Sequence, residues 1–69
     1  MLFIKEAPVG NFEKITKDNH AKYKTVAMGR THKEVLTSLM AAINADEIGD
    51  ENYIELIEDD TVVVKSLQE

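Results

Sequence analysis

The spacing of hydrophobic and polar side chains predicts strands in the first part of the chain. Residues 12–16 and 21–28 both alternate apolar and polar positions, a period of two that is typical of a strand with one solvated face. An Asp-Asn turn signal lies between them, so we expect a hairpin over residues 12–28. Residues 1–5 allow a further short strand, which Pro8 and the Gly-Asn turn after it would end.

The period changes to that of a helix at Thr31. Thr31 and Glu34 match the capping box, in which the threonine hydroxyl accepts the amide of the glutamate and the glutamate reaches back. A helix of about 13 residues should follow, ending in the polar segment 44–52. Its apolar positions form one stripe that suits packing on a sheet: Val35, Leu36, Leu39, Met40 and Ile43.

Two β-rich runs, residues 53–58 and 61–67, follow the helix and predict a second hairpin closed by Asp59-Asp60. The alternation places Ile54, Leu56 and Val63 on one face and Tyr53, Ile57, Val62 and Val64 on the other. Both faces are largely apolar, and one helix covers only one of them. The second face therefore needs the N-terminal segment, another subunit or a partner protein.

Together these elements predict a single small α+β domain over residues 1–69, of the ββαββ type, with an antiparallel sheet and one helix on one face. Because so short a chain buries little surface, we also expect a homo-oligomer, in the first place a dimer. The expected core is Phe12, Ile15, Val26, Met28, Val35, Leu36, Leu39, Met40, Ile43, Ile54, Leu56 and Val63.

Charge is unevenly distributed around the net value of −5. Seven basic and three acidic residues precede Glu34, whereas one basic and ten acidic residues follow from there on. The fold either separates a basic from an acidic face or pairs the two halves and cancels the asymmetry. The chain has no cysteine, and its apolar start is too short for a signal peptide or a membrane span, so we expect a cytoplasmic protein without membrane attachment.

The strand-to-helix junction is a candidate anion site, because helix-start amides attract negative charge. Its tentative ligand-binding residues are Lys24, Arg30, Thr31, His32 and Lys33. The segment lacks the glycine spacing of a phosphate-binding loop, and the competing interpretation is a solvated corner.

The acidic second half offers a different site, one that would contact a basic partner. Its tentative partner-binding residues are Glu51, Glu55, Glu58, Asp59 and Asp60. Spaced carboxylates of this kind suit a protein that mimics nucleic acid, whereas the competing interpretation is that they keep a small protein soluble. The basic hairpin, with Lys14, Lys17, Lys22 and Lys24 beside Tyr23, is a candidate for direct nucleic-acid binding, but the acidic net charge weighs against it.

Metal and catalytic chemistry find little support. Residues 44–55 match several positions of a calcium-binding loop, but Ile48 stands where an oxygen ligand is needed and a strand is expected to follow. His20 and His32 have no recognisable partner set, and no serine has the context of a nucleophile. We therefore expect no enzyme, no metal and no cofactor.

The hypothesis that these patterns favour is a small acidic binding protein, not an enzyme, that modulates or inhibits a larger protein with a basic surface. Its most concrete version is a viral (phage) or mobile-element accessory protein, acting in counter-defence or as a nucleic-acid mimic. One alternative is a homo-oligomer that binds an anionic ligand such as a nucleotide at the helix N-terminus. The other is nucleic-acid binding through the basic hairpin.

Overall fold

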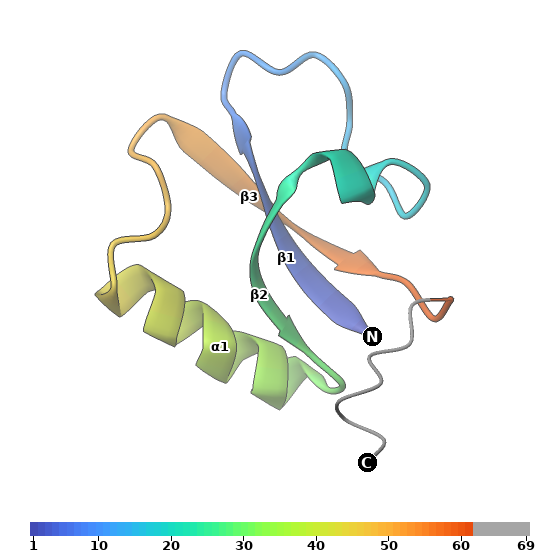
Figure 1. Cartoon of the computed structure of the whole chain (residues 1–69), viewed down its shortest axis with the longest axis vertical. Coiled ribbons are helices and arrows are strands. Elements are labelled where there is room, and N and C mark those ends of the chain that lie inside the picture. Colours follow the sequence, from blue (N-terminus) through green and yellow to red (C-terminus); the bar gives the residue numbers. More distant parts are fainter. Residues whose placement is uncertain (62–69) are drawn as a thin grey trace.

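The structure, a computed structural model, describes residues 1–61, which form three strands and one α-helix. The elements in chain order are β1 (Leu2–Pro8), a 3-10 turn η1 (His20–Lys22), β2 (Lys24–Gly29), α1 (His32–Asn44) and β3 (Asn52–Glu58). The strands make one antiparallel sheet in the order β2-β1-β3 (Figure 1). The predicted α+β class is confirmed.

The central strand is β1, the segment for which the sequence allowed only a short extra strand. It pairs with β2 on one edge and with β3 on the other. Because protein also covers both of its faces, every residue from Leu2 to Ala7 is buried, including Lys5 and Glu6.

The predicted hairpin over residues 12–28 is wrong, because residues 12–16 form no strand and β2 pairs with β1 instead. Asn19 gives a physical reason. Its side-chain oxygen accepts the Thr16 amide at 2.7 Å, and its side-chain nitrogen donates to the Lys14 carbonyl at 2.8 Å. These local bonds satisfy backbone groups that a strand would have paired across a ladder.

Helix α1 begins and ends close to where its sequence predicts. The Thr31 hydroxyl accepts the Glu34 amide at 3.2 Å, and the helix runs for 13 residues. The predicted stripe is only partly right: of its residues, Val35 is buried and Leu39 packs against the core, and Ala42, which was not predicted, is buried beside them. The other three stripe residues, Leu36, Met40 and Ile43, are each more than half exposed. The stripe is too wide because α1 sits mainly over β2 and less over β1.

The sheet separates two apolar clusters. The cluster under α1 contains Leu2, Ile4, Val26, Ala27, Val35 and Ala42, with Leu39 and Ile48 packed against it. The cluster on the opposite face contains Ala7, Ile15 and Ile57, with Tyr23 and Tyr53 against it. Segment 9–23, which connects β1 to β2, supplies Ile15 and lies on the side of the sheet opposite α1 (Figure 1). The N-terminal part of the chain therefore covers the second face.

Several residues of the expected core are exposed instead. They are Phe12, Met28, Leu36, Met40, Ile43, Ile54 and Leu56. The alternation along β3 is confirmed, since Ile54 and Leu56 lie opposite Glu6 and Ile4 while Ile57 lies opposite Phe3. The second strand of the predicted C-terminal hairpin, with Val62, Val63 and Val64, falls outside the described residues, and Thr61 belongs to a turn.

Candidate functional site

The most unusual surface feature is a loop that holds an aromatic side chain out in solvent. Asn11 anchors the loop: its Nδ2 donates to the Glu13 carbonyl at 2.5 Å and to the Tyr53 hydroxyl at 3.1 Å. The Tyr23 hydroxyl in turn donates to Asn11 Oδ1 at 3.4 Å. Phe12 lies between these anchored residues and is fully exposed. The Phe12 side chain is thus not buried, although hydrogen bonds hold the residues on both sides of it.

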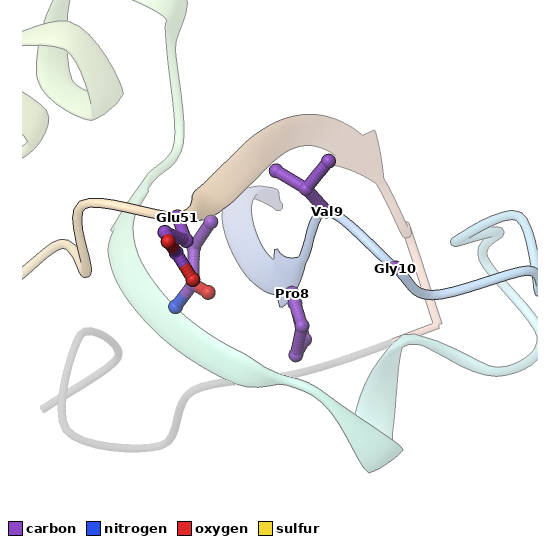
Figure 2. A pocket seen from close by; sticks show the side chains of 5 residues that line it. Pro8, Val9, Gly10 and Glu51 are labelled. Atoms are coloured by element: carbon purple, nitrogen blue, oxygen red, sulfur yellow. The ribbon is translucent and has the colours of Figure 1, made fainter.

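A shallow hollow opens next to this loop, where β1 ends and β3 begins. It has a volume of about 430 Å³ and is lined by Pro8, Val9, Gly10, Glu51 and Asn52. The Val9 amide donates to the Glu51 carbonyl at 2.9 Å, which joins the loop to the start of β3. Val9 is 67% exposed, and Figure 2 shows its side chain on the far side of the hollow from that of Glu51. The hollow therefore combines an apolar wall with one carboxylate.

The structure spreads the five predicted acidic partner-binding residues along β3 and its ends. Glu51 lines the hollow, Glu55 is half-buried opposite Lys5, and Glu58 is exposed opposite Leu2. Asp60, 84% exposed, lies with Oδ1 3.5 Å from the N-terminal amine. Asp59 is buried and is the one member that a partner does not reach. The accessible members are spread along an outer strand of the described sheet, with Glu55 and Glu58 on opposite faces, and form no compact cluster.

Asp59 is tied into the fold by its neighbours. Its Oδ1 accepts the Thr61 hydroxyl at 2.6 Å and the Thr61 amide at 3.0 Å, and its Oδ2 lies 2.7 Å from His20 Nε2. The hydroxyl bond from Thr61 first, and then the bond to His20, lower the pKa of Asp59 to about 2. The ionised carboxylate makes His20 Nε2 the donor, and the His20 ring stacks on Phe3 at 5.1 Å between centroids. Asp59 therefore joins segment 9–23 to the end of β3.

Two further charged side chains are buried within the sheet. Glu6 Oε2 accepts bonds from the Asn52 side chain at 2.8 Å and from the Gly49 amide, and these bonds lower the pKa of Glu6. Lys5 donates to the Thr25 hydroxyl at 2.5 Å, and burial lowers its pKa. Lys5 thus links β1 to β2, and Glu6 links β1 to β3 and to the turn before it.

The structure does not assemble the predicted anion site. Lys24 lies opposite Glu6, at the other end of β2 from Arg30, and its Nζ donates to the Glu47 carbonyl at 3.1 Å. Thr31 caps the helix, and the Glu34 carboxylate accepts the Arg30 amide at 2.9 Å. A carboxylate of the chain itself therefore occupies the start of α1. The two remaining predicted ligand-binding residues, His32 and Lys33, are exposed in the first turn.

The basic residues expected on a hairpin lie on an irregular segment, since that hairpin is not formed. Lys22 Nζ lies 3.1 Å from Glu13 Oε1, which neutralises one of them locally. Residues 44–55, which match several positions of a calcium-binding loop, are divided among the end of α1, a turn and β3. Within residues 1–61, no group of three His, Cys, Asp or Glu side chains is placed to hold a metal ion.

Sequence reasoning missed the Phe12 loop, because Phe12 was assigned to a strand and to the core. A signal was present: residues 8–11 read Pro-Val-Gly-Asn, a turn sequence directly before an isolated aromatic residue. The two tyrosines that hold Asn11 are distant in sequence, so that part of the arrangement had no local signal.

The described part of the chain has no helix with the length and apolar character that a membrane crossing needs. No family model, no curated protein and no solved structure matches this chain, so the functional argument rests on the geometry above.

Proposed function

We propose that this chain is a non-enzymatic binding protein that modulates or inhibits a larger protein by surface contact, with the Phe12 loop as its anchor. The observation that carries the proposal is a fully exposed Phe12 on a loop whose neighbour Asn11 is bonded to Tyr53, Tyr23 and the backbone of Glu13. Because the chain contains no cysteine and depends on no disulfide, we place this action in the cytoplasm.

A fixed loop is a better anchor than a mobile one. A loop that becomes ordered on binding loses conformational entropy. Because the Asn11 bonds already order this loop in the free protein, less entropy is lost when it binds. A large aromatic side chain that enters a partner's pocket is a typical hot spot of an interface. Val9 and the hollow beside it extend the apolar contact. Phe12 and Val9 together therefore supply a small apolar contact ringed by polar groups.

The carboxylates on β3 and at its ends favour a partner protein with a basic surface. Glu51 lines the hollow, Glu55 lies on the face of β3 opposite α1, and Glu58 lies on the α1 face, so β3 and its ends present carboxylates on both sides of the described sheet. From Glu34 to Thr61 the chain has no lysine or arginine, so no basic side chain of β3 or of the turn before it offsets this field. Such a field raises the association rate with a basic surface and disfavours acidic ones. The partner we propose is thus a protein with a basic surface.

The two alternative functions have less support in the geometry. An anionic ligand at the helix start would compete with the Glu34 carboxylate already bonded there, and Lys24 is at the far end of β2. Nucleic-acid binding would need the lysines of a hairpin that does not form. The exposed apolar side chains of Phe12 and Val9, next to the Glu51 carboxylate, suit a protein partner better than either ligand.

The test is capture of partner proteins from a lysate of the source organism on immobilised full-length chain, compared between wild type and Phe12→Ser. We expect a specific protein to be retained by wild type and lost with Phe12→Ser, and its Kd measured with purified components to rise at least about tenfold. Met28→Ser, which changes an exposed apolar residue of β2, is the matched control and should retain the protein. Equal yields for wild type and Phe12→Ser would contradict the proposal.

A second variant tests the role of charge. Glu51→Lys, which reverses the charge of the carboxylate in the hollow, should slow association with the same partner, and the difference from wild type should shrink at high salt. An association rate that is unchanged at low salt would show that the Glu51 carboxylate does not steer binding. Phe12→Ser should instead raise the dissociation rate.

A further inference from the structure

A second apolar surface lies on the other side of the sheet, formed by α1 and β3. On the helix, Leu36, Met40 and Ile43 recur at spacings of four and three residues, so they share one stripe. They directly follow the three core-facing residues of the helix, which are Val35, Leu39 and Ala42. Since successive residues are about 100° apart around a helix, the exposed stripe lies about 100° from the buried one. All three side chains are 54% to 63% exposed.

The topology turns this stripe toward β3. The chain passes from β2 through α1 to β3, which lies beyond β1, and Figure 1 shows that this crossover is right-handed. In a right-handed crossover, the side of α1 that carries the residue directly after each buried one is turned toward β3. Ile54 and Leu56 lie on the same face of the sheet, because they are opposite Glu6 and Ile4, and Ile4 packs under α1.

We call Leu36, Met40, Ile43, Ile54 and Leu56 the α1–β3 surface. Their side chains are 38% to 63% exposed, so roughly 500 Å² of apolar area is open to solvent in the described part of the chain. A standard interface buries about 800 Å² on each partner, of which about 65% is apolar in homodimers. The α1–β3 surface thus has about the apolar area that one subunit of a dimer contributes.

The charges beside this surface complement a second copy in one orientation. Lys33 lies in the first turn of α1, and Glu47 lies just beyond its last turn. If two copies of α1 pack antiparallel about Met40, the Lys33 of each falls beside the Glu47 of the other. The opposed helix dipoles favour the same orientation. A parallel arrangement would instead bring like charges together at both ends.

We propose that the α1–β3 surface is the contact between two copies of this chain, packed with their α1 helices antiparallel about Met40. The contact is isologous, since each copy offers the same stripe and the same pair of end charges. It leaves the Phe12 loop, on the opposite face of the sheet, available in both subunits.

The first test is the mass of the full-length chain by light scattering over a concentration series from micromolar to near-millimolar. The monomer has a mass of 7.8 kDa, and we expect twice that value at the upper end of the series. Met40→Asp should give only the monomer mass while circular dichroism shows the wild-type helix content. Phe12→Asp is the matched control, and its dimerisation should equal that of wild type. A wild-type chain that is monomeric throughout would overturn the proposal.

The orientation has its own test, helped by the absence of cysteine from the chain. Two Met40→Cys chains in the antiparallel arrangement place the new thiols within disulfide reach, so mild oxidation should give a cross-linked dimer. Thr37→Cys, one position off the stripe on the same helix, should cross-link far less. Equal cross-linking of the two variants would contradict packing about Met40.

Charge reversal gives a third readout that a loss of folding cannot imitate. Lys33→Glu alone and Glu47→Lys alone should each weaken dimerisation, and the double variant should recover it, because the pair is restored across the contact. A double variant that dimerises more weakly than both single variants would overturn the antiparallel arrangement. Partner capture by the Phe12 loop does not depend on any of these residues, so the two proposals can fail separately.

Discussion

At the scale of single residues, the structure gives its ionisable groups different tasks from those that their sequence positions favour. Asp59 stands in an acidic run and was expected at a binding surface, yet it is 6% exposed and bonded to His20 and Thr61. Glu6 is equally buried and holds the turn before β3 through Gly49 and Asn52. Through these two carboxylates the sheet holds two segments outside its strands: Glu6 binds the turn at Gly49, and Asp59 binds His20 in segment 9–23. The contribution of both carboxylates should therefore appear in the pH dependence of stability.

We predict that Asp59 makes the fold sensitive to acid. Its pKa falls from 3.8 to about 2 on folding, so the unfolded chain binds the proton more tightly than the folded one. The stabilisation is fully present above pH 3.8 and is lost as the pH falls toward 2. Asp59→Asn should be less stable than wild type at neutral pH, and the gap should narrow across that window. Urea midpoints measured at steps of pH would show it.

Asp60→Asn is the matched control for this prediction. The Asp60 side chain is 84% exposed and faces only the N-terminal amine, at 3.5 Å. Exposed ion pairs contribute little, so its urea midpoint should follow that of wild type at every pH. A gap between Asp59→Asn and wild type that stays constant down to pH 2 would argue against the carboxylate as the acid-sensitive group.

At the scale of elements, the β2–α1 junction is where local sequence and packing agree. Thr31 caps the helix as its sequence predicts, and Gly29 lets the end of β2 approach the first turn. A Cβ added at Gly29 would lie 2.6 Å from the Val35 amide nitrogen and 2.7 Å from the Glu34 Cβ. Since backbone cannot move aside as a flexible side chain can, this site requires glycine.

We predict that Gly29→Ala destabilises the protein by about 1–3 kcal/mol, as overpacking in a close contact does. Gly10→Ala is the matched control, because a Cβ there meets nothing within 4 Å. It should be neutral or slightly stabilising, through the lower entropy of the unfolded chain. Chemical denaturation of the two variants gives both values. A Gly29→Ala chain as stable as Gly10→Ala would mean that the junction adjusts without cost.

At the scale of the whole molecule, segment 9–23 answers the question of what covers the second face of the sheet. It has no regular structure apart from η1, yet Ile15 is 2% exposed and His20 stacks on Phe3. A connection that packs in this way is part of the core, although loops usually run over the surface. The loop and the face beneath it should therefore unfold together with the sheet.

We predict that Ile15→Ala lowers the free energy of unfolding by about 2–5 kcal/mol, the range for deletion of a buried isoleucine side chain. Phe12→Ala, three residues earlier in the same segment, should change it by less than about 0.5 kcal/mol, because Phe12 is fully exposed. Urea denaturation of both variants is the measurement. Similar losses for the two would show that segment 9–23 does not pack as described.

The candidate site was predictable only in part. The acidic character of β3 is visible in the sequence, and Glu51, Glu55, Glu58 and Asp60 remain accessible to a partner. The separation of Lys24 from Arg30 was not predictable, because it depends on the length and direction of β2 in the sheet. The Phe12 loop depends on hydrogen bonds from Asn11 to tyrosines at distant positions. No local window contains both ends of such a bond.

The sequence by itself determined what short-range interactions determine: the α+β class, the Thr31 cap, the length of α1 and the alternation along β3. The tertiary structure alone decided that β1 is the central strand, that β2 pairs with it, and that segment 9–23 covers the second face. The physical reason is that the pattern of apolar residues indicates only which side chains lower the free energy of the protein when they are buried. Which segment covers them is set by long-range pairing and packing, where several partners compete for one apolar face.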